Sequence, residues 1–339
     1  MKVIYFGTNS DFESDTGEGS QRYGYNLYKM LNNAVNIQLI TASNRLGIIK
    51  EALFYKFESE IIHITNFRLL YPIRRNKDSI IIVTAHDFQP LLYPEFSHGA
   101  NSSLNTKIWF LLVKWGLHEL LKADYLLCNS SQTKEEAIKL GFDKNRLFVV
   151  NHGIDKRFMI PIHPKKDKDK FIVGYLGAMR KRKNLELGIN AANAIKSKDI
   201  FFDIWGKKDF EYEYLVSISK NKNINFKGFA PEEKIVNIYD SFDVFIFPSY
   251  HEGEGLPILE AQSRGLPVII YKYGKIPKEV RKYCFEAESP EHMAQIIENL
   301  KENGYNEKLK KKATEYARSF TWGKCAKGTL EIYKKVLKK

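Results

Sequence analysis

The stretch from residue 243 to residue 271 combines the patterns of a strand, a polar loop, a helix and a second strand. An apolar run at 244–247 ends at a proline and is typical of a buried strand. The segment 249–256 is polar and rich in glycine, and Pro257 suits the first position of a helix. A further apolar run at 268–271 predicts the next strand. This order predicts a parallel sheet, whose ligands bind at the carboxyl ends of the strands.

Two carboxylates accompany this loop, Glu252 within it and Glu260 on the predicted helix. Gly253, Gly255 and Leu256 bring the backbone close to a ligand, and the N–H groups at the start of the helix favour an anion. A carboxylate beside an anion site suits a ligand that carries both phosphates and hydroxyl groups, as a nucleoside diphosphate sugar does. The alternative is that Glu260 only complements the helix dipole and that Glu252 is solvated.

The whole string resembles the signature of the retaining GT-B glycosyltransferases of family 4. The matching residues are Pro248–Ser249, Glu252–Gly253–Glu254–Gly255–Leu256–Pro257, Leu259–Glu260–Ala261 and Gly265–Leu266–Pro267–Val268. The resemblance implies an α/β protein of two doubly wound Rossmann-like domains that face each other across a cleft. It implies transfer of a sugar from a nucleoside diphosphate sugar to an acceptor hydroxyl, with retention at the anomeric carbon. No metal and no cofactor beyond the donor substrate are expected, and the product belongs to glycan or glycolipid assembly.

The length of 339 residues predicts two domains, each able to bury its own core. The charged, proline-bearing stretch 161–170 is the expected linker. We therefore expect an acceptor-side domain at 1–160 and a nucleotide-sugar-binding domain at 161–322. The resemblance adds that the terminal helix, within 323–339, packs back on the first domain.

A basic loop follows the strand predicted at 171–176. Arg180, Arg182 and Lys183 precede a predicted helix, where they suit a diphosphate. The loop resembles the arginine–lysine–asparagine loop of the family, in which Arg182 and Lys183 match directly. Ala178 stands where many relatives carry an arginine, so the resemblance leaves that role to Arg180 or Arg182.

Three further positions match the family. Gly19 matches the glycine of its first loop, where the backbone approaches the donor phosphate, and Gly228 matches the glycine near which the base is held. His86 follows the strand predicted at 80–84 and matches a histidine that commonly faces the reacting sugar. Taken alone, a histidine at such a place is more often structural. The resemblance makes Glu252 and His86 the expected catalytic residues.

The implied mechanism rests on charge rather than on a nucleophile. Arg182, Lys183 and the amides near Gly255 and Gly19 would stabilise the leaving diphosphate, while Glu260 would hold the ribose. Glu252 would orient the sugar hydroxyls and support the positively charged ring. No nucleophile is assigned, because retention in this family is ascribed to attack by the acceptor on the face from which the leaving group departs.

The net charge of +13 suits an anionic substrate, an anionic membrane or a nucleic acid. Basic residues among apolar ones make peripheral contact with an anionic membrane a candidate, where a lipid-linked acceptor would lie. They are Arg68, Arg74, Arg75 and Lys77, with the segment 107–122. The alternative is a solvated surface and an ordinary core helix. We expect a sugar or lipid-linked acceptor and no nucleic acid. The alternatives are an inactive GT-B-like binding module or a basic protein that binds nucleic acid or membrane.

Three widely spaced cysteines form neither a disulfide framework nor a zinc pattern. The pattern of residues 1–6 predicts a strand from the first residues on, and we expect no signal peptide. No apolar run approaches the roughly 18 residues of a membrane span. These features predict a cytoplasmic protein, placed at the cytoplasmic face of the membrane if the basic residues contact lipid.

Overall fold

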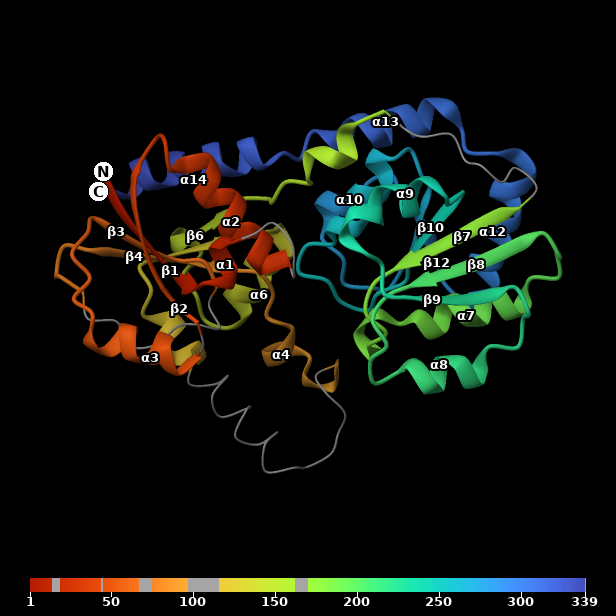
Figure 1. Cartoon of the computed structure of the whole chain (residues 1–339), viewed down its shortest axis with the longest axis horizontal. Helices are drawn as coiled ribbons and strands as arrows, with labels where there is room; N and C mark the ends of the chain where they lie inside the picture. Colours follow the sequence, from red (N-terminus) through yellow and green to blue (C-terminus); the bar gives the residue numbers. More distant parts are fainter. Residues whose placement is uncertain (14–18, 44, 67–74, 97–115, 162–169, 339) are drawn as a thin grey trace. The chain divides into compact units, whose positions relative to one another are not determined.

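The computed structural model describes residues 1–13, 19–43, 45–66, 75–96, 116–161 and 170–338. This part of the chain divides into two compact units (Figure 1). The first comprises Met1–Gly153 and Thr321–Lys339, and the second comprises Ile154–Phe320. The chain therefore leaves the first unit once and returns to it at the end.

In the described part of the first unit, six strands form one parallel sheet. In sheet order they are β2 (Asn36–Ala42), β1 (Lys2–Thr8), β3 (Ile61–Ile64), β4 (Ile80–Ala85), β5 (Tyr125–Cys128) and β6 (Leu147–Val149). The helices are α1 (Ser10–Glu13), α2 (Gly19–Leu31), α3 (Arg45–Phe54), α4 (Gln89–Leu92), α6 (Ser131–Lys139) and α14 (Trp322–Val336), with short 3-10 turns at Pro94–Phe96 and Lys144–Arg146. Apolar clusters cover both faces of the sheet, which is why its strands are continuous apolar runs.

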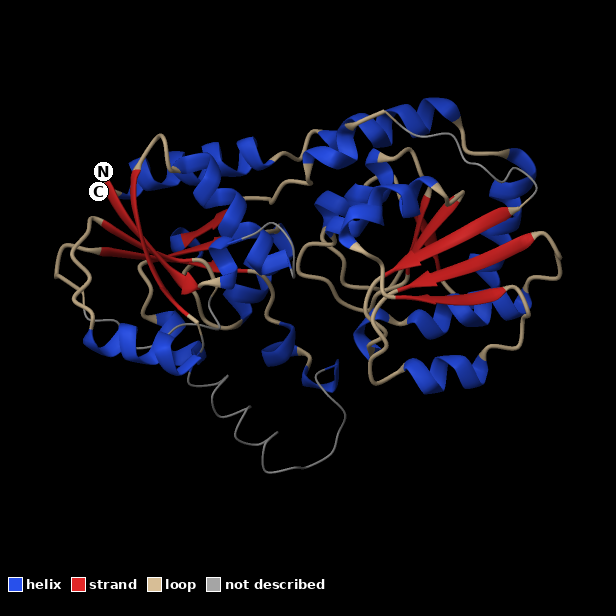
Figure 2. Cartoon of the chain, in the orientation of Figure 1, coloured by secondary structure: helices blue, strands red, loops and turns tan. Residues whose placement is uncertain are grey.

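The described residues of the second unit form another parallel sheet of six strands. In sheet order they are β12 (Phe285–Ala287), β11 (Val268–Tyr271), β10 (Val244–Phe247), β7 (Phe171–Leu176), β8 (Ile200–Trp205) and β9 (Ile224–Gly228). The helices are α7 (Leu185–Ala194), α8 (Tyr212–Ile218), α9 (Ile235–Asp240), α10 (Leu256–Ser263), α11 (Lys278–Arg281), α12 (Pro290–Asn303) and α13 (Glu307–Arg318), with 3-10 turns at Lys156–Met159, Lys181–Lys183 and Glu232–Lys234. Helices lie on both faces of each sheet (Figure 2), so the predicted class of two doubly wound α/β domains is confirmed.

One glycine of β7 permits close packing inside the second unit. A Cβ added to Gly174 would lie 2.1 Å from the ring of Phe242, far inside van der Waals contact. The ring therefore lies directly against the strand, and only glycine leaves room for it.

The terminal helix α14 is part of the core of the first unit. Tyr333 is fully buried and donates a hydrogen bond from its hydroxyl to the hydroxyl of Tyr5 on β1. The same hydroxyl is hydrogen-bonded to His63 Nδ1 on β3. Residues from both ends of the chain thus share one buried polar network.

The two units meet in sequence at residue 153, earlier than the predicted boundary between residues 160 and 161. The physical reason is burial, because Ile154 and Phe158 pack into the core of the second unit. Most of the predicted linker, residues 162–169, lies outside the described residues.

Arg264, at the end of α10, ties this early segment to the second unit. Its side chain has no exposed surface and makes a two-pronged ion pair with Asp240, each N–O distance being 2.7 Å. It also donates to the carbonyls of Phe158, Ile160 and Pro161, at 3.2, 2.6 and 3.1 Å. A buried guanidinium with so many acceptors holds the segment in one position.

Among the described residues, no helix combines the length and the apolar character that crossing a bilayer requires.

We expect Arg264→Met to lower the free energy of unfolding by about 3–5 kcal/mol, because it leaves the Asp240 carboxylate buried without its cation. Urea denaturation at pH 7 measures this loss. The matched control is Arg281→Met, which removes a partly exposed ion pair with Glu286 and should cost roughly 0–1 kcal/mol. Equal losses in the two variants would contradict the assignment.

Candidate active site

Glu252 lies in the loop after β10 and accepts hydrogen bonds from two cations. Lys183 Nζ donates to Oε1 at 2.8 Å, and Arg182 Nη1 donates to Oε2 at 3.0 Å. Arg182 Nη1 also reaches the carbonyl of His251, at 3.1 Å. Lys183 lies over the ring of Phe247, 5.1 Å from its centroid. The cations follow β7 and the carboxylate follows β10, and these strands are neighbours in the sheet.

Glu252 is only 6% exposed. Burial alone would raise its pKa, but the charges of Lys183 and then Arg182 outweigh burial and hold the pKa at about 2. Glu252 is therefore ionised at neutral pH. The alternative in which it is a solvated carboxylate is wrong, since the side chain is buried and paired with both cations.

Hydrogen bonds to backbone carbonyls hold the two loops together around this cluster. Asn184 adopts the left-handed conformation (φ 49°), which asparagine tolerates better than most residues. Its Nδ2 donates to the carbonyl of Pro248 at 3.1 Å. The N–H of Tyr250 donates to the carbonyl of Arg182 at 2.9 Å. The basic loop and the Glu252 loop are thus joined on both sides of the ion pairs.

The helix after the Glu252 loop begins at Leu256, so Pro257 is its second residue rather than its first. Gly255 precedes the helix with φ 82°, a conformation that favours glycine. Gly253 is buried in the turn that leads to it. Glu260, one turn into α10, is also buried.

The carboxylate of Glu260 accepts a hydrogen bond from the hydroxyl of Tyr239, at 2.9 Å. Tyr239 was not among the residues predicted for the site. It lies on α9, 21 residues before Glu260, and no motif links the two positions.

Arg180 lies apart from the Glu252 cluster. Its Nε donates to Asp209 Oδ2 at 2.5 Å, and its side chain is 45% exposed. Of the two arginines considered for the diphosphate, Arg182 is therefore the one beside Glu252. Gly228 ends β9 with φ 79°, and its carbonyl accepts from the N–H of Gly206 at 2.8 Å.

Gly19 and His86 belong to the first unit and are described within it. Gly19 is the first residue of α2. His86 follows β4, and its Nε2 donates to the carbonyl of Thr65 at 2.8 Å. Its ring packs edge-on against Tyr23, 5.2 Å away, and His152, 5.3 Å away.

The residues considered for membrane contact are only partly described. Arg68, Arg74 and residues 107–115 lie outside the described residues. Arg75 pairs with Asp124, and Lys122 pairs with Glu119 at 2.7 Å. Membrane contact and the absence of a nucleic-acid partner therefore stay predictions. Within the described ranges, no three His, Cys, Asp or Glu side chains are grouped so that they could hold a metal ion.

The low pKa of Glu252 predicts a pH-dependent contribution to stability. The folded-state pKa is about 2 and the ordinary value is 4.5, so the unfolded chain takes up the proton first as the pH falls. The stability from this carboxylate is complete above pH 4.5 and is lost toward pH 2. We expect the difference in unfolding free energy between wild type and Glu252→Gln to fall by about 2 kcal/mol from pH 6 to pH 3.

Urea titrations at several pH values measure this difference. Glu302→Gln, which removes an exposed carboxylate from α12, is the matched control. The same pH dependence for both variants would sink the assignment of Glu252 as the ionised partner of Arg182 and Lys183.

Comparisons with known proteins match both units. The family model described as "Glycosyl transferases group 1" matches residues 156–320. The model described as "Glycosyltransferase Family 4" matches residues 15–158. The first match contains the Glu252 cluster and Glu260, and the second contains Gly19 and His86.

Individual relatives are distant. O-antigen chain mannosyltransferase B of Escherichia coli is 25% identical over 299 residues, which are 82% of this chain and 75% of the relative. D-inositol 3-phosphate glycosyltransferase of Paenarthrobacter aurescens is 24% identical over 242 residues, and the chain spans just over half, 57%, of its length.

The fold has close counterparts among solved structures. Anabaena HepE in complex with UDP superposes with a TM-score of 0.71 at 16% identity, covering 99% of this chain and 100% of that one. The two family matches together run from residue 15 to residue 320, and with the two parallel Rossmann-like sheets they show that the chain belongs to the GT-B glycosyltransferases.

Proposed function

We propose that this glycosyltransferase transfers a sugar from a nucleoside diphosphate sugar to an acceptor hydroxyl with retention at the anomeric carbon, in glycan or glycolipid assembly. The observation that carries the proposal is the buried cluster of Arg182, Lys183 and Glu252 at the carboxyl edge of the second sheet. The family 4 signature supports retention and a reaction without metal. The O-antigen mannosyltransferase among the relatives supports a glycan product.

The two cations of the cluster suit a diphosphate leaving group. Arg182 and Lys183 are held at one loop end by Glu252, and the N-terminus of α10 begins four residues beyond it. Negative charge grows on the diphosphate as the glycosidic bond breaks, and cations already in position stabilise that charge most. The UDP bound in the structurally similar HepE supports a nucleotide donor.

Glu252 serves as an acceptor of hydrogen bonds and as a fixed negative charge. Because its pKa lies at about 2, it carries no proton to donate to a leaving group at neutral pH. A sugar hydroxyl can donate to it, and its charge favours the positive ring that develops in the transition state. The acid–base pair of glycosidases is therefore not part of this mechanism.

Glu260 suits the ribose of the donor. Its buried carboxylate is oriented by the Tyr239 hydroxyl, and a carboxylate can accept from both ribose hydroxyls. His86, in the first unit, stays the second proposed catalytic residue. Its ring orientation is set by its hydrogen bond to Thr65 and by Tyr23.

We expect Lys183→Ala to weaken binding of nucleoside diphosphates clearly more than binding of the corresponding nucleosides, because the nucleoside lacks the phosphates. A thermal-shift panel of UDP-, GDP- and ADP-sugars first selects the nucleotide. Calorimetry then measures binding of that nucleoside diphosphate and of the corresponding nucleoside. A donor at about 100 times its dissociation constant should add roughly 2.7 kcal/mol of stability. Lys181→Ala, an exposed lysine of the same turn, is the matched control. Equal losses for nucleoside and diphosphate would overturn the phosphate site.

Glu260 and Glu252 should separate donor binding from turnover. Glu260→Gln should weaken binding of the free nucleoside diphosphate, since the ribose loses a charged acceptor. Glu252→Gln should leave that binding largely intact and should slow turnover of the donor sugar. Calorimetry and initial rates measure the two effects, and the reverse pattern would mean that the two roles are exchanged.

A further inference from the structure

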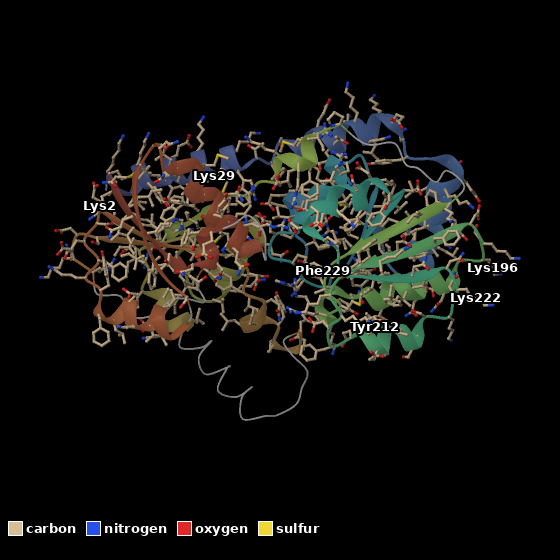
Figure 3. The ribbon with its side chains drawn as sticks, in the orientation of Figure 1. Lys2, Lys29, Lys196, Tyr212, Lys222 and Phe229 are labelled. Atoms are coloured by element: carbon tan, nitrogen blue, oxygen red, sulfur yellow. The ribbon has the colours of Figure 1, made fainter. Side chains whose placement is uncertain are left out.

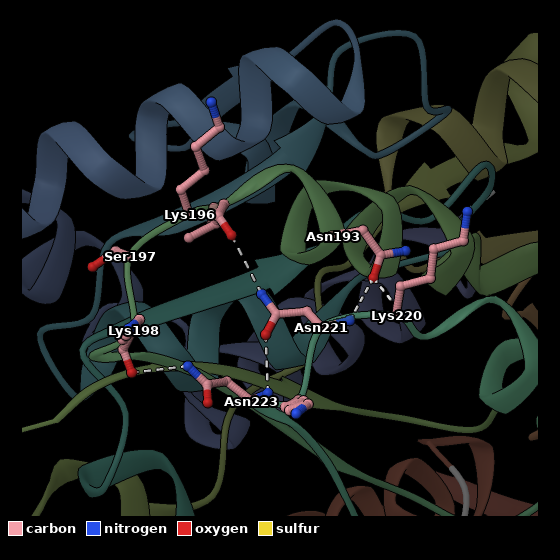
Figure 4. Close-up of a pocket in the computed structure, with 9 residues that line it drawn as sticks. Asn193, Lys196, Ser197, Lys198, Lys220, Asn221 and Asn223 are labelled. Carbon is pink, nitrogen blue, oxygen red and sulfur yellow. Dashed lines mark hydrogen bonds between the residues drawn. The ribbon is translucent and has the colours of Figure 1, made fainter.

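A polar pocket lies at the amino ends of strands β8 and β9 in the second sheet. It has a volume of about 450 Å³ and is formed by the loop before β8, the loop before β9 and Asn193 at the end of α7 (Figure 4). Figure 3 shows Lys196 and Lys222 at this end of the strands and Phe229, which follows β9, at the other. The pocket is therefore separate from the Glu252 cluster, which lies at the carboxyl ends of the strands.

Asparagine side chains make the floor of this pocket rigid. Asn193 Oδ1 accepts from the N–H groups of Lys220 and Asn221, at 2.8 and 3.1 Å. Asn223 Nδ2 donates to the carbonyls of Lys198 and Ile200, both at 3.0 Å. These bonds tie each loop to its neighbour, so the pocket has a defined shape without a ligand.

Each loop presents two lysines that flank a smaller polar residue. Lys196 and Lys198 flank Ser197, and Lys220 and Lys222 flank Asn221. Figure 4 shows the side chains of Lys196 and Lys220 extending in the same direction on either side of Asn221. All four lysines are exposed.

These four lysines have no ion-pair partner in the part of the chain that the structure describes. The neighbouring carboxylate, Asp199, is paired instead with Lys301, at 2.6 Å. Four cations around one hollow repel one another, so the pocket favours a ligand with several negative charges.

Helix capping does not account for the lysines. The helices α7 and α8 end beside the pocket, and cations are common at helix C-termini. Here asparagine amides bind the terminal carbonyls, with Asn221 Nδ2 donating to Ala192 at 2.6 Å and Asn193 Nδ2 donating to Ile218 at 2.8 Å. The carbonyls of Ala192 and Ile218 are therefore bound without an ammonium group.

We infer that this pocket binds a ligand with clustered phosphate groups, either a soluble diphosphate or the headgroup of a phospholipid. Its volume is in the range of small-molecule sites, and lysine binds phosphate as a point charge. A nucleic-acid duplex is far larger than the pocket. The inference does not depend on the proposed transfer reaction, because the lysines lie at the amino ends of the strands and the proposed donor site lies at their carboxyl ends.

The test titrates inorganic pyrophosphate into the full chain by calorimetry. All proteins carry Lys183→Ala, which weakens the proposed donor site and gives every variant the same background. Replacing Lys196, Lys198, Lys220 and Lys222 by serine should weaken pyrophosphate binding at least tenfold. The matched control replaces Lys308, Lys311, Lys312 and Lys324 by serine, which removes the same charge outside the pocket. It should change pyrophosphate binding by less than twofold.

Flotation with vesicles of phosphatidylcholine and cardiolipin, four to one, distinguishes the two sources of phosphate. Loss of flotation in the pocket variant alone, with flotation kept by the control, identifies a lipid headgroup. Pyrophosphate binding without flotation identifies a soluble ligand. If neither pyrophosphate nor vesicles bind, or if pocket variant and control lose binding equally, the inference is overturned. Circular dichroism of each variant verifies that the fold is intact.

Discussion

The buried carboxylate of Glu252, shared by Arg182 and Lys183, is the interaction on which the second unit's site depends. Burying three charges is costly, and removing Glu252 would leave two buried cations without their counter-charge. Together they carry one surplus positive charge at the carboxyl edge of the sheet. That surplus is what prepares the edge for an anion. Because the cations reach Glu252 from a neighbouring loop, one ion cluster also sets the geometry of both loops.

Much of this cluster could be predicted from the sequence because it depends on local patterns. Strands recognisable as apolar runs end at the same end of a parallel sheet, which places Lys183 and Glu252 at that end. That β7 and β10 are neighbours, so that the two side chains pair, was not predicted. The partner of Glu260 could not be predicted, because Tyr239 lies on another helix and follows no motif. The same is true of Arg264, which pairs with Asp240 and binds the carbonyls of Phe158, Ile160 and Pro161. Such contacts depend on tertiary packing.

A different kind of polar core supports the first unit. Tyr23 and His63 are both hydrogen-bonded to the hydroxyl of Thr84, at 2.9 and 2.8 Å. Burial lowers the pKa of His63 to about 3, so the ring is neutral and the network carries no charge. Tyr23 also packs on His86. The first unit therefore orients its candidate histidine with neutral hydrogen bonds and ring contacts, whereas the second unit positions its site with charges.

The place of α14 has a consequence for synthesis on the ribosome. The second unit is one continuous segment, Ile154–Phe320, whereas the first needs Thr321–Lys339 to complete its core. The chain emerges from its N-terminus and domains fold as units, so the second unit is complete before the first. Nascent Tyr5 and His63 must wait for Tyr333, the last partner to be made. Premature termination of translation before α14 would thus leave the first unit without a complete core.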